Sequence, residues 1–331
     1  MSERLTNNHG LSLAMSIWLA HEEYTNGADQ FPGEDVISAT SLLKPPKQII
    51  LGNRVPISEN KLDVMDLFSS AHGHALHDSV EKAWMNPQRA MERMGYPKKV
   101  REAIVVNPDP AEVQDGQIPV YLEQRAFKRL TVDDNIFVIS GKFDQVIDGQ
   151  LNDTKKTGVY TYIAGSKEED YRIQASIYRW LNPDLITSDE ILIQFIFTDW
   201  KAGDVNRIKG YPPTPVYEFK VQLMSLGETE YWIKKRIRRL VAEQDLPQSQ
   251  MTPCNDEELW MTKPKYKYYM DPKKANDPKS RASKASDDLA ELTQHRISKG
   301  KGVIVTIPGE AKACKYCKAS AICDQAKELR K

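Results

Sequence analysis

Two aspartates and a lysine in the middle of the chain have the types and the spacing that phosphodiester hydrolysis needs. Asp144 ends one β-type run, Asp148-Gly149 turns the chain back, and Asp153 and Lys155 follow two residues apart on the returning strand. Because side chains two apart on a strand share a face, this hairpin can bring both carboxylates and the ammonium group to one point. Carboxylates hold Mg²⁺ or Mn²⁺, which polarises a phosphoryl oxygen and lowers the pKa of a bound water, while a nearby lysine stabilises developing charge.

An alternative interpretation gives these residues no chemistry, since Asp is common in hairpin turns and Asp-Lys pairs occur on solvated edge strands. Two flanking segments favour the chemical interpretation. Gln174 and Tyr178 lie four apart on a helix expected over 168–181, so both side chains project from one face. Upstream, His77 lies within a helical pattern that runs from 62 to 94.

The ordered series of these short motifs resembles the RecB-like branch of the PD-(D/E)XK nucleases, and in particular phage-encoded exonucleases related to the CRISPR-associated RecB-like nucleases. The series spans roughly 105 residues and consists of Gly73-xxx-His77, Gly141-xx-Asp144, Asp153-x-Lys155 and Gln174-xxx-Tyr178. Each motif is weak by itself, and the order of the set carries the resemblance.

The resemblance implies a role for each residue of the series. Lys155 would be the catalytic lysine, and Gln174 and Tyr178 would support it or contact the DNA backbone. The implied ligands of Mg²⁺ or Mn²⁺ are the carboxylates of Asp144 and Asp153, the main-chain carbonyl of Thr154, the imidazole of His77 and an additional acid, Glu123. The family commonly has an aromatic residue where Thr154 stands, but that side chain points to the opposite strand face, so the site should tolerate the change. A second interpretation of the histidine segment pairs His74 with His77 at a zinc ion.

Four cysteines form a second candidate site. The chain contains only Cys254, Cys314, Cys317 and Cys323, and the last three lie within ten residues. Four thiolates suit either a 4Fe-4S cluster or a structural Zn²⁺, and spacing alone does not decide between them. The CxxC-x5-C tail with one distant cysteine is similar to the 4Fe-4S clasp of RecB-like nucleases, although their lone cysteine usually precedes the nuclease core. Such a cluster would be a structural staple.

Basic residues are concentrated in two segments, although the whole chain balances 46 Lys and Arg against 46 Asp and Glu. Residues 263–284 contain eight Lys or Arg and two Asp, interleaved with Tyr266, Tyr268 and Tyr269, and five basic residues lie between 234 and 239. Cations beside aromatic rings are typical of single-strand binding. A solvated loop and an ordinary charged helix face are the alternative.

The periodicity of the chain predicts the elements that position these residues. They are a helical lead-in over 11–43 that ends at Pro45-Pro46, β runs over 118–151, and an apolar strand over 191–200 that should be buried on both faces. This order indicates an α/β chain with a mixed sheet flanked by helices, and the resemblance implies a restriction-endonuclease-like core. The expected parts are a lead-in over 1–60, a nuclease core over 61–245, and a cysteine clasp with a basic DNA-guiding loop over 246–331.

The sequence thus predicts a Mg²⁺- or Mn²⁺-dependent DNA exonuclease that serves phage DNA recombination, repair or degradation. Its expected partners are single-stranded DNA or duplex ends, with a recombination protein as a further candidate. The alternatives are a DNA-binding accessory subunit without nuclease turnover, which keeps the Fe-S or zinc cluster, and a zinc-containing structural protein. No apolar run approaches the roughly 20 residues that span a bilayer, and a signal-peptide pattern is not seen, so a cytoplasmic location is expected.

Overall fold

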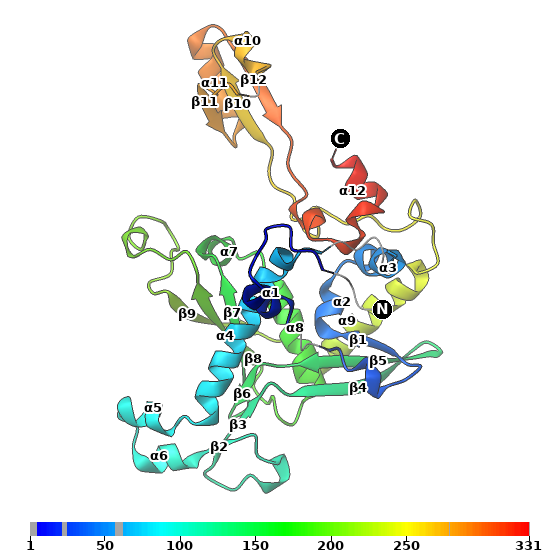
Figure 1. Ribbon diagram of the computed structural model, residues 1–331, viewed down its shortest axis with the longest axis vertical. Coiled ribbons are helices and arrows are strands. Elements are labelled where there is room, and N and C mark those ends of the chain that lie inside the picture. Colours follow the sequence, from blue (N-terminus) through cyan, green and yellow to red (C-terminus); the bar gives the residue numbers. More distant parts are fainter. Residues whose placement is uncertain (1–4, 22–24, 57–61, 278, 331) are drawn as a thin grey trace. The chain divides into compact units, whose positions relative to one another are not determined.

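The computed structural model describes residues 5–21, 25–56, 62–277 and 279–330 (Figure 1). The chain divides into two compact units, each assembled from two segments. The first unit contains Met1–Leu43 and Lys61–Arg239, and the second contains Lys44–Asn60 and Leu240–Lys331. The lead-in expected over 1–60 is therefore divided between the units. Within the described ranges, no helix combines the length and the apolar composition that crossing a membrane requires.

A six-stranded mixed sheet organises the first unit. In spatial order its strands are β2 (Ile104–Val106), β3 (Ile118–Leu122), β6 (Gln145–Ile147), β7 (Gln150–Thr157), β8 (Glu190–Phe197) and β9 (Val216–Gln222). The pairs β2–β3 and β7–β8 are parallel, and the other pairs are antiparallel. The predicted α/β class with a mixed sheet is confirmed at this level.

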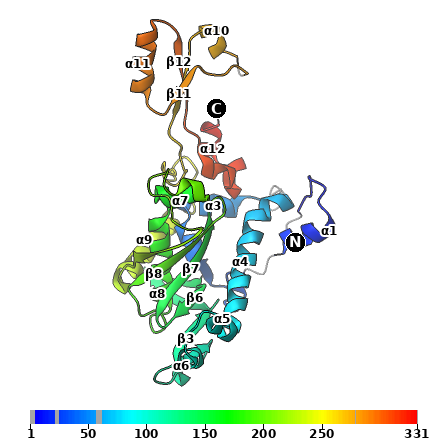
Figure 2. The ribbon, with the colours of Figure 1, turned by 90° about the vertical axis from the view of Figure 1, so that its left-hand side faces the viewer.

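Helices follow β7 and lead the chain across to β8. They are α7 (Val159–Ala164) and α8 (Glu168–Leu181), and α8 packs against strands of both sheets of this unit. Its buried face includes Ile177 and Trp180, which are 0% and 2% exposed. Figure 2 shows the sheet and its helices from the side.

The strand predicted over 191–200 ends earlier and is not buried on both faces. Along β8 fully buried residues alternate with half-buried ones, so only one face is fully covered. The covered face carries Ile191, Ile193 and Phe195, against which α7 and α8 contribute aromatic rings. An apolar run cannot by itself tell a strand covered on two faces from one covered on a single face.

A second, three-stranded sheet of the first unit lies in the order β1-β5-β4, with β1 (Asp35–Ser38), β5 (Asn135–Lys142) and β4 (Arg125–Val132). Here the helical lead-in predicted over 11–43 is wrong in part, because β1 interrupts it between α1 (Leu13–Ala20) and α2 (Ala39–Leu43). The strand forms by parallel pairing with β5, about 100 residues later in the chain. A local pattern does not contain that partner.

The remaining helices of this unit include the long helix that the histidine motif predicts. They are α4 (Phe68–Met85), α5 (Gln88–Arg93), α6 (Lys98–Ala103) and α9 (Leu226–Glu243), the last of which continues into the second unit. Gly73 lies inside α4 without breaking it, and a Cβ there would have no neighbour within 4 Å.

The second unit contains the four cysteines and a small antiparallel sheet. Its elements are α3 (Pro46–Arg54), β10 (Lys265–Tyr269), α10 (Pro272–Ala275), β11 (Lys284–Ser286), α11 (Leu289–Lys299), β12 (Val303–Ile307) and α12 (Asp324–Glu328). The sheet order is β11-β10-β12. An apolar core joins α3 residues Ile50 and Leu51 to Leu240, Met251 and Ala319.

The basic segment over 263–284 is not the loop that the sequence suggests. It supplies β10, α10 and β11, and Tyr268 and Tyr269 are only 0% and 6% exposed. The Tyr268 hydroxyl donates a hydrogen bond to the carbonyl of Lys301 at 2.9 Å, and its ring meets His295 edge-on. These two tyrosines are core residues and offer no stacking surface for bases.

Candidate active site

The hairpin of β6 and β7 brings the two predicted aspartates together. Asp148 and Gly149 form its turn with φ values of 48° and 80°, the left-handed pair that suits a two-residue hairpin. The strands pair in the register Gln145↔Asn152, so Asp144 lies beside the start of the Asp153 segment. The backbone N–H of Thr154 donates to Asp144 Oδ2 at 3.1 Å and fixes that carboxylate.

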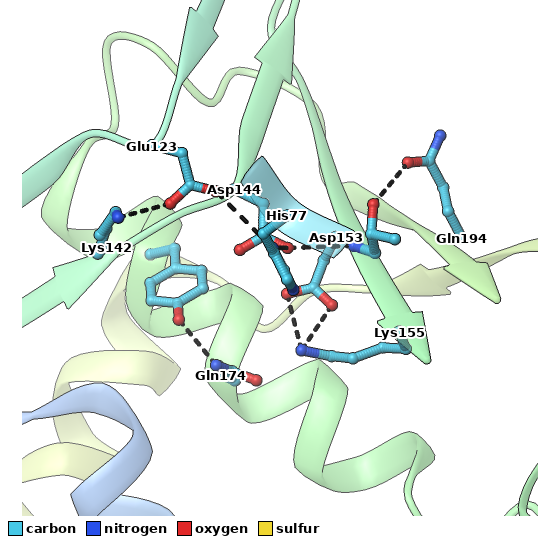
Figure 3. A network of polar contacts seen from close by, with 10 residues as sticks. His77, Glu123, Lys142, Asp144, Asp153, Lys155, Gln174 and Gln194 are labelled. Atoms are coloured by element: carbon cyan, nitrogen blue, oxygen red, sulfur yellow. Dashed lines mark hydrogen bonds and ion pairs between the residues drawn. The ribbon is translucent and has the colours of Figure 1, made fainter. Parts of the chain in front are cut away.

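Asp153 and Lys155 share one face of β7 and form an ion pair. Lys155 Nζ lies 2.7 Å from Asp153 Oδ2 and 3.0 Å from Oδ1, and Asp153 is 4% exposed (Figure 3). Burial disfavours the ammonium charge, but the attraction of Asp153 and Asp144 outweighs it and raises the pKa of Lys155. The lysine is therefore a fixed cation. Thr154 points to the other face, where its hydroxyl donates to Gln194 Oε1 at 3.3 Å, as the strand alternation predicts.

His77 and Glu123 meet Asp144 from two other elements. His77 Nδ1, on α4, lies 3.3 Å from Asp144 Oδ2 and 3.7 Å from Glu123 Oε1. One ligand atom from each of the three residues falls within 4.8 Å of the others, and among the described residues this is the group of three that could hold a metal ion. Figure 3 shows the three side chains converging in front of the hairpin.

Glu123 reaches this position through an uncommon backbone conformation. It lies between β3 and β4 with a φ of 50°, a left-handed value that non-glycine residues seldom adopt. Its N–H donates to the carbonyl of Asp144 at 2.8 Å, which locks the turn against the hairpin. Its side chain also pairs with Lys142, whose Nζ lies 2.6 Å from Oε2. The β runs predicted over 118–151 are therefore interrupted at Glu123, between β3 and β4, at the residue that joins the site.

The charges around Asp144 favour a cation. Burial, followed by repulsion from Asp153, raises the pKa of Asp144 to about 7. The hydrogen bond to Glu123 raises the pKa of His77 against the opposing effect of burial. Burial acts to raise the pKa of Glu123, but the hydrogen bonds from His77 and Lys142 bring it below its ordinary value.

This donor set fits a divalent cation. Two carboxylates and an imidazole in one cluster are ligands that Mn²⁺ accepts, and carboxylates also suit Mg²⁺. The cluster lines a cavity of about 470 Å³ whose wall also contains Arg125, Lys142 and Tyr178. The cluster contains His77 and not His74, although His74 also lines the cavity. His72 lies elsewhere, with its Nδ1 2.6 Å from Lys156 Nζ.

Gln174 and Tyr178 are brought together, with Gln174 Nε2 donating to the Tyr178 hydroxyl at 2.7 Å. Tyr178 also packs on β5 at Gly141, where a Cβ would lie 2.9 Å from its ring and 2.6 Å from Leu181 Cδ1. The aromatic neighbour of Lys155 is Tyr171, whose ring centroid lies 5.8 Å from Nζ.

Tyr171 and Lys142 are the site residues that the sequence interpretation missed. Tyr171 precedes Gln174 by three positions, so the helical period of the Gln-xxx-Tyr motif could have indicated it. Lys142 can pair with Glu123 because β4, which follows Glu123, runs antiparallel to β5 with Arg125 opposite Lys142. That pairing is not visible in the motif itself.

The four cysteines are free and half-buried in the second unit. Cys254 is tied to α12 by two hydrogen bonds, since its N–H donates to Gln325 Oε1 at 3.0 Å and its carbonyl accepts from Gln325 Nε2 at 2.8 Å. Cys317 and Cys323 pack against the core around Ile50. Burial, with smaller contributions from Glu258, Cys323 and Cys317, raises the pKa of the Cys254 thiol to about 12.

The second basic group, on α9, is engaged within the protein. Lys234 pairs with Glu230 at 2.7 Å, Arg236 donates to the carbonyl of Leu42 at 2.9 Å, and Arg238 pairs with Asp133 at 3.0 Å. These contacts support the interpretation of a charged helix face over that of a DNA guide.

Comparisons with known proteins find no matching family model and no matching curated protein. Among solved structures, SSO0001 aligns with a TM-score of 0.41 and 14% identity over 72% of this chain and 89% of SSO0001. A phage-related exonuclease from Haemophilus somnus 129PT aligns with a TM-score of 0.23 and 16% identity over 51% of this chain and 85% of that one. Both scores lie below 0.5, so the chemistry has to be argued from the geometry of the site.

Proposed function

We propose that this chain is a metal-dependent DNA nuclease that hydrolyses phosphodiester bonds. The observation that carries the proposal is the convergence of His77, Glu123 and Asp144 within 4.8 Å beside the buried Asp153–Lys155 pair. An ordinary hairpin turn has no need of five ionisable groups from three elements at one point, and such clusters of perturbed groups are typical of functional sites.

The cluster would hold Mg²⁺ or Mn²⁺ through His77, Glu123, Asp144 and Asp153, and the main-chain carbonyl of Thr154 is an additional candidate ligand. The bound ion supplies Lewis-acid stabilisation of the phosphoryl oxygen and lowers the pKa of the attacking water. Glu123 and Asp144 present acceptor oxygens toward the cavity, while the Thr154 N–H keeps Asp144 in place.

Lys155 acts as a fixed cation next to the ligands. Its ammonium group has three N–H donors, and one of them is donated to Asp153 Oδ1, while Asp153 Oδ2 takes part only in the ion pair. A further N–H is then available to a phosphoryl oxygen or to the attacking water. Because Asp153 holds the ammonium group in one place, the charge is preorganised toward the transition state. Gln174 and Tyr178 buttress the cavity wall on the α8 side.

The choice of DNA and of exonucleolytic action follows from the ordered motif series, which resembles phage-encoded RecB-like exonucleases. On that resemblance the protein would act in DNA recombination, repair or degradation in the cytoplasm of a phage host, on single strands or duplex ends and with a recombination protein as a partner. The same resemblance assigns the four cysteines a structural 4Fe-4S cluster, with Zn²⁺ as the alternative.

Chelation tests the proposal directly. Linear single-stranded and double-stranded oligonucleotides, labelled at either end, are incubated with the protein and Mn²⁺ or Mg²⁺. We expect cleavage that EDTA stops and that added Mn²⁺ restores, with label release giving the polarity. Binding without cleavage under every condition would instead identify a DNA-binding accessory subunit.

A further inference from the structure

A second cavity, of about 520 Å³, lies beside the first turn of α8. Tyr171 belongs to its wall and also places its ring 5.8 Å from Lys155 Nζ. The rest of the wall includes aromatic residues from α7, β8 and β9, charged residues, an isoleucine and two glycines. The aromatic and charged residues of the wall, besides Tyr171, are Tyr162, Phe195, Phe219, Lys167, Glu168 and Lys209.

Strand register places this cavity on the face of the sheet that carries the proposed catalytic residues. Lys155 pairs with Phe195 across β7 and β8, and Phe195 pairs in turn with Tyr217 on β9. Asp153 is related to Phe219 in the same way, through Ile193. Directly paired residues share a face of a sheet. The side chains of Asp153 and Lys155 therefore lie on the same face as the aromatic side chains of β8 and β9.

The aromatic rings form a stacked and partly open surface. The rings of Phe195 and Phe219 are nearly parallel, 7° apart with centroids separated by 5.4 Å, and Tyr162 meets Phe195 edge-on at 5.5 Å. Phe195 is 2% exposed and closes the floor, whereas Tyr162 and Phe219 are half-buried at the opening.

The wall carries charges of both signs, since it includes Glu168 and Lys167, which lies 2.8 Å from Asp170. Lys209 is exposed and is the cation of this wall that can contact a phosphate. Cavities of about 300–1,000 Å³ with aromatic walls and few polar groups are typical of small-ligand sites, so this one is large enough for a nucleobase. Aromatic side chains beside cations are the elements by which proteins hold unpaired bases.

We propose that this aromatic pocket takes one unpaired nucleobase of the DNA strand whose scissile phosphate lies at the His77–Glu123–Asp144 cluster. The inference rests on the proposed nuclease function and makes the substrate strand single-stranded at a nucleotide next to the cleaved bond. A base stacks on the ring of Phe219 or Tyr162, and Lys209 contacts a flanking phosphate. Duplex ends would need to fray by at least that nucleotide.

Abasic substitution tests the pocket. A set of end-labelled single strands carries one abasic nucleotide at successive positions, and the rate of cleavage at each bond with Mn²⁺ is read from the product lengths. We expect wild-type cleavage to fall roughly 10-fold at a bond with a fixed offset from the abasic site, because one stacked base is lost. Other bonds should be unaffected.

Two variants and a control tie the effect to the pocket. The Phe219→Leu variant should cleave the intact strand more slowly than wild type. Its cleavage rate should no longer depend on the position of the abasic nucleotide. Tyr160→Ala, an exposed tyrosine of α7 that is 66% exposed and lies outside the cavity wall, should behave as wild type. Lys209→Glu changes an exposed residue, so it should fold normally and bind single strands several-fold more weakly.

The outcomes separate this inference from the proposed function. If wild type cleaves DNA but the abasic profile is flat and Lys209→Glu binds normally, the pocket holds no base and only this inference is overturned. If wild type cleaves no DNA at all, both are overturned. Equal rates on fully paired and frayed ends would likewise contradict the pocket.

Discussion

Asp153 and Lys155 stabilise the fold as an ion pair and are also proposed to take part in catalysis, so a single substitution would affect both roles at once. Their ion pair is buried, so removing one partner leaves the other charge uncompensated, and the same pair is proposed to act on the phosphate. A loss of activity after one substitution could then reflect either unfolding or lost chemistry. The two effects need to be separated at this position.

A pair of single variants and their combination provides that separation. Lys155→Met should lower the free energy of unfolding by about 2 kcal/mol, a modest value for a buried pair because the lysine side chain is 25% exposed. Asp153→Asn combined with Lys155→Met removes both charges and should recover most of that stability. Cleavage should be at least roughly 100-fold slower in all three proteins. Urea unfolding and cleavage rates measure the two quantities, and a stable double variant that still cleaves would refute the assignment.

Glu123 offers a test of the metal cluster that does not depend on DNA. Glu123→Gln keeps the size of the side chain but removes a charged ligand, so titration calorimetry should show Mn²⁺ affinity reduced roughly 10-fold or more. Asp148→Asn is the matched control, because it removes an acid from the turn of the neighbouring hairpin and Asn accepts a φ of 48° there. Equal affinities in both variants would mean that Glu123 is not a ligand.

At the scale of elements, the packing of α8 on β5 sets the position of the cavity wall. Gly141 allows this close approach, since a Cβ would lie 2.6 Å from Leu181 Cδ1 and 2.9 Å from the Tyr178 ring. Gly141→Ala should therefore destabilise the protein by about 1–3 kcal/mol and slow cleavage by moving the helix. Gly73→Ala, inside α4 with open space around it, should instead stabilise the protein by about 0.5–1 kcal/mol. Thermal unfolding checks both signs, and an unaltered Gly141→Ala variant would show that the contact is not tight.

The elements that could be predicted from the sequence are those whose cause is local. The hairpin around Asp148-Gly149 follows from its turn residues, and α8 follows from its apolar period over 14 residues. By contrast, β1 depends on a partner strand about 100 residues away, and the left-handed turn at Glu123 depends on the Asp144 carbonyl. Non-local partners of this kind leave no periodic signal in the segment itself.

The tyrosines of β10 illustrate the same limit on the candidate DNA surface. Their alternation with lysines suggested exposed rings, but β10 is the central strand between β11 and β12, and α11 covers Tyr268. The segment has the predicted lysines and tyrosines, but the rings of Tyr268 and Tyr269 are buried. Because burial is decided by strands that follow tens of residues later, the sequence segment alone does not reveal it.

At the scale of the whole molecule, the balanced total charge conceals an uneven distribution. Lys234 and Arg238 of α9 are paired within the protein, whereas on β10 Lys265 is exposed. The proposed DNA contacts come from the first unit, around the two cavities. A neutral chain can still bind a polyanion when the positive charge is local.

The cysteines of the second unit lead to a prediction about the integrity of that unit. Cys317 and Cys323 pack against the core around Ile50, α12 holds Cys254, and burial raises the pKa of the Cys254 thiol to about 12, so that thiol is neutral without a cation. The cluster proposed for these four cysteines is a structural 4Fe-4S cluster, with a tetrahedral Zn²⁺ as the alternative.

Protein purified without oxygen should accordingly contain about four irons per chain and absorb visible light, and air should bleach it. Cys317→Ser should lose the iron and unfold at a lower temperature, because a ligand that binds only the folded state contributes its binding free energy to stability. Tyr316→Ala, whose side chain is 78% exposed between two of the cysteines, should keep the iron and serves as the control. One zinc ion per chain and no visible absorption would show that the cysteines bind zinc instead of an iron–sulfur cluster. A metal-free protein of unchanged stability would show that the cysteines are ordinary thiols.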